Sequence, residues 1–123
     1  MNTETLFDRI GGEYAINAAV DSFYEKVLSD DLLYPFFEGI CMDTQMSSMK
    51  SFLTVAFGHG SSETIKNMRE VHAPLVEKGL NDTHFDAILG HMTETLQELS
   101  IAENLIAEVQ DVVESYRDEV LNR

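Results

Sequence analysis

The chain has few basic residues, a single cysteine, no tryptophan and no long apolar run. Its 123 residues include 8 Lys and Arg against 22 Asp and Glu, which gives a formal net charge of −14. So few bases argue against binding to nucleic acid, because affinity for phosphate backbones comes mostly from Lys and Arg. They argue equally against docking on anionic lipid. We therefore expect neither a nucleic-acid partner nor a membrane partner.

Cys41 is the single cysteine, so an internal disulfide and a cysteine-rich metal cluster are both excluded. A reduced cytoplasm is the simplest compartment for such a chain. No stretch approaches the roughly 20 apolar residues that a membrane span requires. The acidic segment from Met1 to Arg9 also lacks the apolar centre of a signal peptide. These observations predict a cytoplasmic protein.

Apolar residues are nevertheless frequent enough to build one core. They make up 44% of the sequence and include 7 Phe and 4 Tyr, which excludes an acidic disordered chain. This length fits one domain, so residues 1–123 are expected to fold as a single unit. The net charge favours solubility, and we expect a monomer.

Apolar residues recur with helical spacing along nearly the whole chain. A first short stripe ends at Gly11 and Gly12, a glycine pair that suits a tight turn. A longer helix, beginning near Tyr14, is predicted to bury one face. That face consists of Ile16, Val20, Phe23, Tyr24, Val27 and Leu28.

The rest of the chain also shows helical patterns. The polar stretch 60–64 is predicted to be a loop, followed by a short helix that contains Pro74. Because proline is tolerated in the first turn of a helix, His72 is expected at the start of that helix. The final helix is predicted to open with a capping box between Ser100 and Glu103. With no β-hairpin signal, the sequence predicts an all-α fold.

Four histidines are candidates for metal ligation. His59, His84 and His91 lie off the apolar stripes, and we expect them at the surface, where histidine is common. His72 differs because it lies among apolar residues of its own segment. A lone histidine on an apolar face is more often a satisfied core side chain than a ligand. The local pattern leaves both interpretations open.

Phenylalanine, tyrosine and methionine are spread over several helices. Such side chains suit either a methionine-rich core or the lining of a pocket for a large, flat, apolar ligand. The residues concerned are Phe23, Tyr24, Phe36, Phe37, Met46, Met49, Phe52, Phe57, Met68, Phe85 and Met92.

Basic residues gather in the stretch 44–69. Lys50, Lys66 and Arg69 stand there against the single acid Glu63, so this stretch carries +2 and the remainder −16. Chance clustering explains three residues about as well as a basic rim beside an apolar pocket does. Haem has two propionates and an iron that takes a neutral imidazole, so it would satisfy the aromatic lining, the basic rim and His72 together.

Several short motifs carry a further signal through their order and spacing. They are Gly11-Gly12, Phe23 to Leu28, Pro35-Phe36-Phe37, Phe52 to Gly58, Met68 to Val76, Gly79-Leu80 and His84 to Ile88. Individually these motifs are weak, but together they are specific, and they extend over nearly the whole chain. The sequence resembles the truncated haemoglobins, closest to the group I proteins of cyanobacteria and ciliates.

The resemblance implies a two-over-two helical sandwich, a truncated globin fold, around haem b. His72 matches the proximal iron ligand, Tyr24 the distal tyrosine that stabilises a bound ligand, and Gln45 its polar partner. Lys50 and Arg69 match positions that pair with the propionates. The other expected haem contacts are Phe37, Met49, Phe52, Phe57, Phe85 and Met92.

Two positions depart from the cyanobacterial pattern. Ser48 stands where those relatives have a second distal histidine, so bis-histidine coordination of the iron is not expected. Tyr116 stands where they can have a late histidine that bonds covalently to a haem vinyl group. A covalent link by that route is therefore not expected.

The implied function is binding of O2, NO and CO at the iron, in oxygen transport and handling or in NO detoxification. Converting NO to nitrate would require an external electron-donor reductase, so enzymatic activity stays open. Two other classes also stay open. One is a haem-based sensor or storage module without turnover, and the other is a helical interaction protein without a cofactor.

Overall fold

The structure, a computed structural model, describes residues 4–58 and 62–123 but not the side chains of residues 62–68. His59 therefore lies outside the described residues, as do the side chains of Lys66 and Met68. The described ranges are helical and contain no strand, which confirms the all-α prediction. The elements are α1 (Leu6–Ile10), α2 (Gly12–Leu28), the short 3-10 helix η1 (Tyr34–Phe36), α3 (Met42–Phe57), α4 (Ser62–Glu77), α5 (Asp82–Glu98), α6 (Glu103–Glu114) and α7 (Arg117–Leu121).

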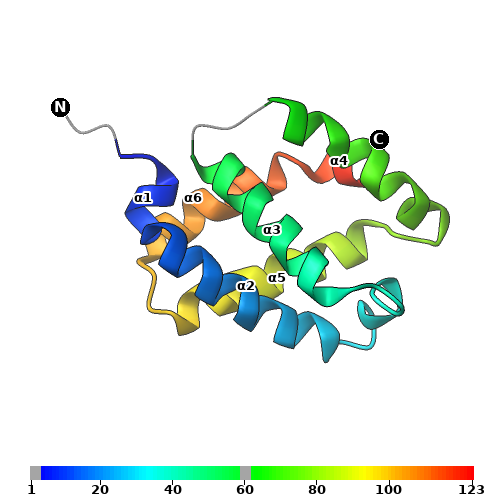
Figure 1. Ribbon diagram of the computed structural model, residues 1–123, viewed down its shortest axis with the longest axis horizontal. Coiled ribbons are helices and arrows are strands. Elements are labelled where there is room, and N and C mark those ends of the chain that lie inside the picture. The colour runs from blue at the N-terminus through cyan, green and yellow to red at the C-terminus, as the bar shows by residue number, and fades with distance from the viewer. Residues whose placement is uncertain (1–3, 59–61) are drawn as a thin grey trace.

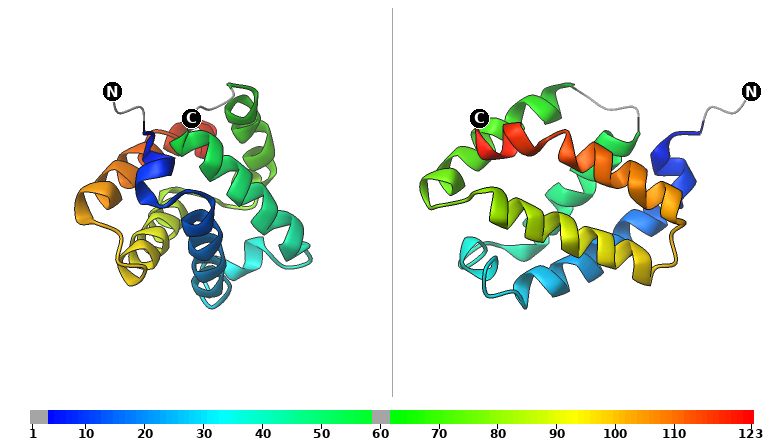
Figure 2. Two further views of the ribbon diagram at one scale, coloured as in Figure 1. Left: turned by 60° about the vertical axis from the view of Figure 1, so that its left-hand side comes forward. Right: turned by 180° about the vertical axis from the view of Figure 1, so that it is seen from behind.

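Two helix pairs form the body of the molecule (Figures 1 and 2). α2 packs against α3 in one pair and α5 against α6 in the other, while α2 also packs against α5. α1 contacts α2 and α6 at one end. α4 packs mainly against the short α7 and only lightly against α3. The core therefore lies where α2, α3 and α5 meet.

One face of α2 is the centre of this core. Val20, Phe23 and Val27 are completely buried, as the helical spacing predicts. Leu53 of α3 and Leu96 of α5 belong to the same cluster. Burying an apolar side chain of this size contributes roughly 1.5–3 kcal/mol. The contacts of this face therefore fix how the two helix pairs meet.

The Gly11–Gly12 turn joins α1 to α2, as predicted. Gly11 has φ 121° and Gly12 has φ 67°, conformations that residues with a Cβ atom resist. A Cβ atom placed on Gly11 would lie 3.0 Å from the Cβ of Ala15. The turn therefore requires glycine at this position on two grounds, conformation and space.

The helix that carries His72 is longer than the sequence predicts. α4 begins at Ser62, so residues 62–64 are helical rather than loop and His72 lies well inside the helix. The expectation that Pro74 occupies the first turn is wrong, because Pro74 stands near the other end. Only one intrahelical hydrogen bond is lost there, since Pro74 has no amide hydrogen to donate.

Gly79 ends α4, which the sequence did predict. Gly79 has φ 107°. Its amide donates to the Val76 carbonyl, and the Leu80 amide donates to the Leu75 carbonyl, both at 3.0 Å. This pair of bonds satisfies carbonyls at the helix end in the manner of a Schellman motif.

The C-terminal region differs from the prediction in two ways. The predicted final helix is two helices, because α6 ends at Glu114 and α7 begins at Arg117. The predicted capping box is wrong as well. Ser100 has φ 60° and closes α5, its amide donating to the Gln97 carbonyl at 3.0 Å. Ser100 is therefore committed to the end of one helix, and Ala102 precedes the next.

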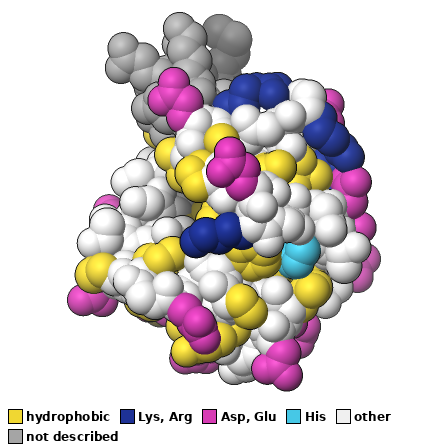
Figure 3. All heavy atoms as spheres, turned by 90° about the vertical axis from the view of Figure 1, so that its right-hand side faces the viewer, with side chains coloured by type: hydrophobic (Ala, Val, Ile, Leu, Met, Phe, Trp, Pro, Cys, Tyr) yellow, Lys and Arg dark blue, Asp and Glu magenta, His cyan; other side chains and the backbone are white. Residues whose placement is uncertain are grey.

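One face of the molecule carries both acidic and apolar side chains (Figure 3). Figure 3 looks onto the side of the molecule that carries the α4–α5 connection, and hydrophobic side chains are visible there among acidic ones. No helix in the ranges 4–58 and 62–123 is both long and apolar enough to cross a membrane.

Gly11 and Gly90 provide a matched pair of glycine-to-alanine substitutions. Gly11→Ala is expected to lower the free energy of unfolding by roughly 1–2 kcal/mol, because the backbone stays at positive φ and the new Cβ meets Ala15. Gly90→Ala is expected to raise it by roughly 0.5–1 kcal/mol, because α5 has open space around this position. Urea unfolding followed by circular dichroism measures both. Effects of the same sign would contradict the strain assigned to Gly11.

Candidate functional site

Tyr24 and Gln45 form a buried polar pair between α2 and α3. The Tyr24 side chain is only 2% exposed. The amide nitrogen of Gln45, in the first turn of α3, donates a hydrogen bond of 3.0 Å to the Tyr24 hydroxyl oxygen. Since that oxygen acts as the acceptor, the hydroxyl hydrogen can donate to a third group. The structure thus brings together the two residues expected on the distal side.

Burial keeps the Tyr24 phenol protonated. The apolar surroundings raise the pKa of Tyr24 above its ordinary value, and the hydrogen bond from Gln45 offsets part of this rise. The phenol is therefore neutral throughout the neutral pH range. A neutral phenol can act as a hydrogen-bond donor, whereas a phenolate cannot.

Aromatic rings flank this pair. The Phe23 ring meets Tyr24 edge to face with centroids 5.0 Å apart, and Phe37 does the same at 5.8 Å. Phe37 follows η1 and is half-buried. The expected contact residue Phe37 therefore lies directly beside the expected distal tyrosine.

His91 and Asp30 connect α5 to the segment that leads into η1. His91 Nε2 lies 2.7 Å from Asp30 Oδ2, and Asp30 Oδ1 accepts the amide hydrogen of Leu32 at 2.9 Å. These hydrogen bonds, that of His91 first, lower the pKa of Asp30. The surface position expected for His91 is wrong, because its side chain is only 22% exposed and ties two elements together.

Large apolar side chains stand half-buried at the edge of the core. They pack against it but keep part of their surface accessible, and they are Met42, Met46, Met49, Phe52 and Ile88. The expected contacts Met49 and Phe52 are therefore accessible to a ligand. Met42 was missed, although it precedes Met46 by four residues and so shares its face of α3.

Three other expected contacts lie deeper. Phe57, Phe85 and Met92 are each at most 5% exposed. Phe57 and Met92 belong to the buried core cluster. Phe85 is covered on one ring face by the guanidinium of Arg117, 4.4 Å from the ring centroid. These three side chains are not part of an open surface, and their contact with a haem stays a prediction.

His72 lies on the inner side of α4. Its side chain is half-buried, as are those of Leu75 and Val76, whereas the neighbouring Val71 is 63% exposed. His84 has a different role, because its Nδ1 accepts the amide hydrogen of Asn81 in the capping box of α5. The role of His72 as iron ligand stays a prediction, and its half-buried position is compatible with it.

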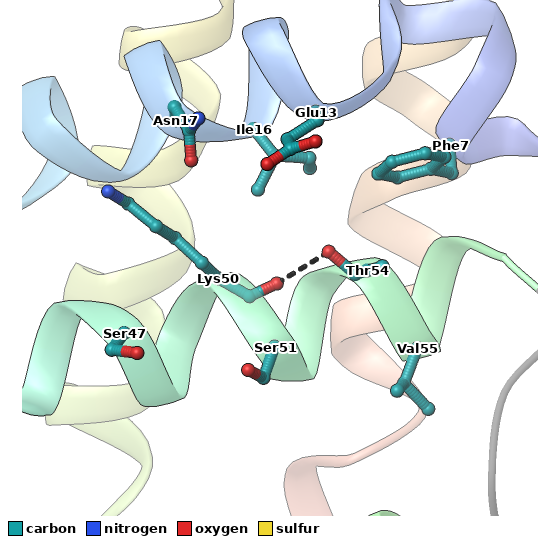
Figure 4. Close-up of a pocket in the computed structure, with 9 residues that line it drawn as sticks. All are labelled: Phe7, Glu13, Ile16, Asn17, Ser47, Lys50, Ser51, Thr54 and Val55. Carbon is teal, nitrogen blue, oxygen red and sulfur yellow. Dashed lines mark hydrogen bonds between the residues drawn. The ribbon is translucent and has the colours of Figure 1, made fainter.

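Lys50, an expected propionate partner, lies on the side of α3 that faces α2. Its Nζ is 3.8 Å from Asp21 Oδ1 on α2. It also lines an open groove of about 450 Å³ between α2 and α3, with Phe7 at the other end and Glu13 pointing in from α2 (Figure 4). Five helical residues correspond to about 140° of rotation, so Lys50 and Gln45 face different sides of α3. The pairing of Lys50 with a propionate stays a prediction.

Arg69 is also engaged elsewhere. Its Nη2 donates to the carbonyl oxygen of Arg123 at 3.0 Å, which directs the guanidinium toward the end of α7. Two side chains of the expected basic rim are described, and each has its own polar partner. Lys50 lies near Asp21, and Arg69 bonds to Arg123.

The sequence did not reveal a polar network around α7. Arg117 donates to Asp82 Oδ1 at 2.9 Å and to Asp86 Oδ1 at 2.5 Å, both in the first two turns of α5. Tyr116, which precedes α7, meets the Phe52 ring at 5.3 Å. The local sequence indicates only one pair of this network, because Glu114 stands three residues before Arg117 and accepts a hydrogen bond from it. The bonds of Arg117 join α7 to α5, and the ring contact of Tyr116 joins the start of α7 to α3.

The raised pKa of Tyr24 predicts a loss of stability at alkaline pH. Because this pKa is higher in the folded than in the unfolded chain, the contribution of Tyr24 is complete below the ordinary value of about 10 and falls as the pH rises through the folded-state pKa. The difference in unfolding free energy between the wild type and Tyr24→Phe should therefore shift against the wild type above about pH 10. Urea unfolding across this range measures it, with Tyr14→Phe as an exposed control. A difference that is independent of pH would contradict the burial argument.

Comparison with known proteins identifies a family. A family model described as bacterial-like globin matches residues 5–122. The group 1 truncated hemoglobin GlbN from Synechocystis sp. is 43% identical over 122 residues, which cover 97% of this chain and 98% of that protein. The group 1 truncated hemoglobin of Tetrahymena thermophila is 37% identical, with 97% of this chain and 96% of that protein covered.

Solved structures agree with this assignment. The 2/2 hemoglobin from Synechococcus sp. PCC 7002, crystallised in the cyanomet state with covalently attached heme, matches with a TM-score of 0.92 and 41% identity over 98% of this chain and 100% of that one. The Fe(III) form of truncated hemoglobin from Tetrahymena pyriformis gives 0.84 and 36% identity over 96% and 98%. These matches confirm the two-over-two helical sandwich. The chain belongs to the bacterial-like globin family and, within it, to the group 1 truncated haemoglobins.

Proposed function

We propose that this protein binds O2 and other diatomic gases, with His72 as the iron ligand on one side and Tyr24 and Gln45 on the other. The observation that carries the proposal is the buried Tyr24–Gln45 pair. Its hydroxyl oxygen is held by the Gln45 amide at 3.0 Å, which leaves the hydroxyl hydrogen available to a ligand. Its cofactor is haem b, the cofactor of the globins.

The residues present fit a haem. A haem needs apolar side chains around its ring and a neutral nitrogen ligand for its iron. Half-buried Met46, Met49 and Phe52 offer apolar surface, and covering it contributes about 25 cal/mol per Å². Phe37 extends this surface from the segment after η1. His72 offers an imidazole from the inner side of α4.

A haem iron held by a neutral imidazole binds O2, NO and CO. On the distal side, Tyr24 donates a hydrogen bond toward a ligand that carries partial negative charge, and Gln45 fixes the direction of the phenol. The rings of Phe23 and Phe37 keep water from competing for that hydrogen bond. The chain thereby favours a polarised diatomic ligand.

Oxygen handling is the role that this donor pair supports best. Detoxification of NO would add turnover, which requires a reductase outside this chain. The net charge of −14 would suit a basic electron donor, and it supports a monomeric protein. The single cysteine fits a cytoplasmic one. Slow reduction of the ferric protein together with poor NO consumption would favour sensing or storage instead.

Tyr24→Phe tests the distal role. Removing the donor of one buried hydrogen bond is expected to raise the rate of O2 dissociation by roughly ten- to a hundredfold. Stopped-flow replacement of O2 by CO measures this rate, and Tyr14→Phe, at an exposed position, is the control. An unchanged rate in Tyr24→Phe would exclude Tyr24 as the stabilising donor.

His72→Gly tests the iron ligand. The variant is expected to retain haem poorly and to show an altered Soret band, and added imidazole should restore both by occupying the deleted side chain's place. His84→Gln, which changes a helix cap, is the control and should keep the wild-type spectrum. If His72→Gly holds haem as the wild type does, with or without imidazole, His72 is not the ligand.

A further inference from the structure

The helix that carries His72 is held mainly by α7. α4 packs more extensively against α7 than against α3, and Figures 1 and 2 show the C-terminal segment, in red, beside α4, in green. Two hydrogen bonds join them in opposite directions. Asn122 Nδ2 donates to the Arg69 carbonyl at 3.0 Å, and Arg69 Nη2 donates to the Arg123 carbonyl at 3.0 Å. Arg69 precedes His72 by three residues, so the two lie on neighbouring turns of one side of α4.

α7 is in turn fixed to α5 by a shared carboxylate. Asp82 accepts a hydrogen bond from Arg117 through Oδ1 at 2.9 Å and another from Arg123 through Oδ2 at 2.7 Å. Arg117 also lies over the Phe85 ring of α5. Because each carboxylate oxygen holds a different arginine, both ends of α7 are tied to the start of α5.

One hydrogen bond within α4 is missing close to His72. Pro74, two residues after His72, cannot donate the hydrogen bond that would bind the Glu70 carbonyl within the helix. The bond from Asn122 reaches the adjacent carbonyl, that of Arg69. Asn122 has φ 57° and ψ 47°, a left-handed conformation that asparagine adopts more readily than most residues.

We propose that Asn122 is a positioning residue for His72. Its hydrogen bond to the Arg69 carbonyl joins the end of α7 to α4. Arg123, which accepts from Arg69 and donates to Asp82, joins the same end of α7 to α5. All of these contacts lie within the chain, and the residues that make them are Arg69, Asp82, Arg117, Asn122 and Arg123. Their effect on the iron rests on the proposed function of His72.

Asn122→Gly removes the donor while keeping a backbone that adopts the left-handed conformation freely. In the haem-loaded protein, amide hydrogen exchange in residues 70–77 should become two- to tenfold faster, the factor that losing one hydrogen bond gives. Transfer of haem to apomyoglobin should accelerate by a similar factor. The iron–histidine stretching band of the ferrous protein should shift or broaden in the Raman spectrum.

Arg9→Gln is the matched control. It removes the bonds from Arg9 to Glu108, at 2.8 and 2.7 Å, which join α1 to α6. It should leave exchange in α4, haem transfer and the iron–histidine band unchanged. Unchanged exchange and haem transfer in Asn122→Gly would overturn the proposal, and so would faster exchange with an unaltered iron–histidine band. Failure of the proposed iron ligand is seen separately, as normal haem retention in His72→Gly.

Discussion

The buried face of α2 is the constraint on which the rest of the structure depends. Val20, Phe23 and Val27 are 0% exposed, and α2 contacts both α3 and α5. Because these contacts fix the position of α2, Tyr24 lies next to the first turn of α3, where Gln45 donates a hydrogen bond to its hydroxyl. A buried hydroxyl without a partner costs about 1–3 kcal/mol, and this hydrogen bond offsets that cost. Apolar packing thereby places the polar group.

The two sides of the proposed site are held by different forces. Tyr24 is fixed by close packing in the core, which salt and pH hardly affect in the neutral range. α4 is joined to the end of α7 by two exposed hydrogen bonds, and Arg123 in turn forms an ion pair with Asp82 near the surface, where dissolved salt screens the attraction. Tyr24 is therefore held by the core itself, whereas the helix that carries His72 packs mainly against the short α7.

Local patterns in the sequence predicted the local parts of the fold. The inward face of α2 and the turn at Gly11 follow from spacing and from glycine's conformational freedom, so both were predictable. Pro74 misled the prediction of α4, because a rule about isolated helices takes no account of a neighbouring helix that supports the chain. The role of Lys50 came from the resemblance alone, and the structure adds only that its side chain lies near Asp21, on another side of α3 from Gln45.

Contacts between distant segments could not be predicted in the same way. Asn122 bonds to a residue 53 positions earlier, and no local pattern marks that pair. The assignment of Tyr24 and Gln45 came from the resemblance to a family, and the structure adds their mutual distance and burial. The hydrogen bond between them also has a direction. The Gln45 amide donates to the phenol oxygen, which leaves the phenol hydrogen free to donate to a further group. A ligand that only accepts hydrogen bonds, as O2 does, can therefore use the phenol as its donor.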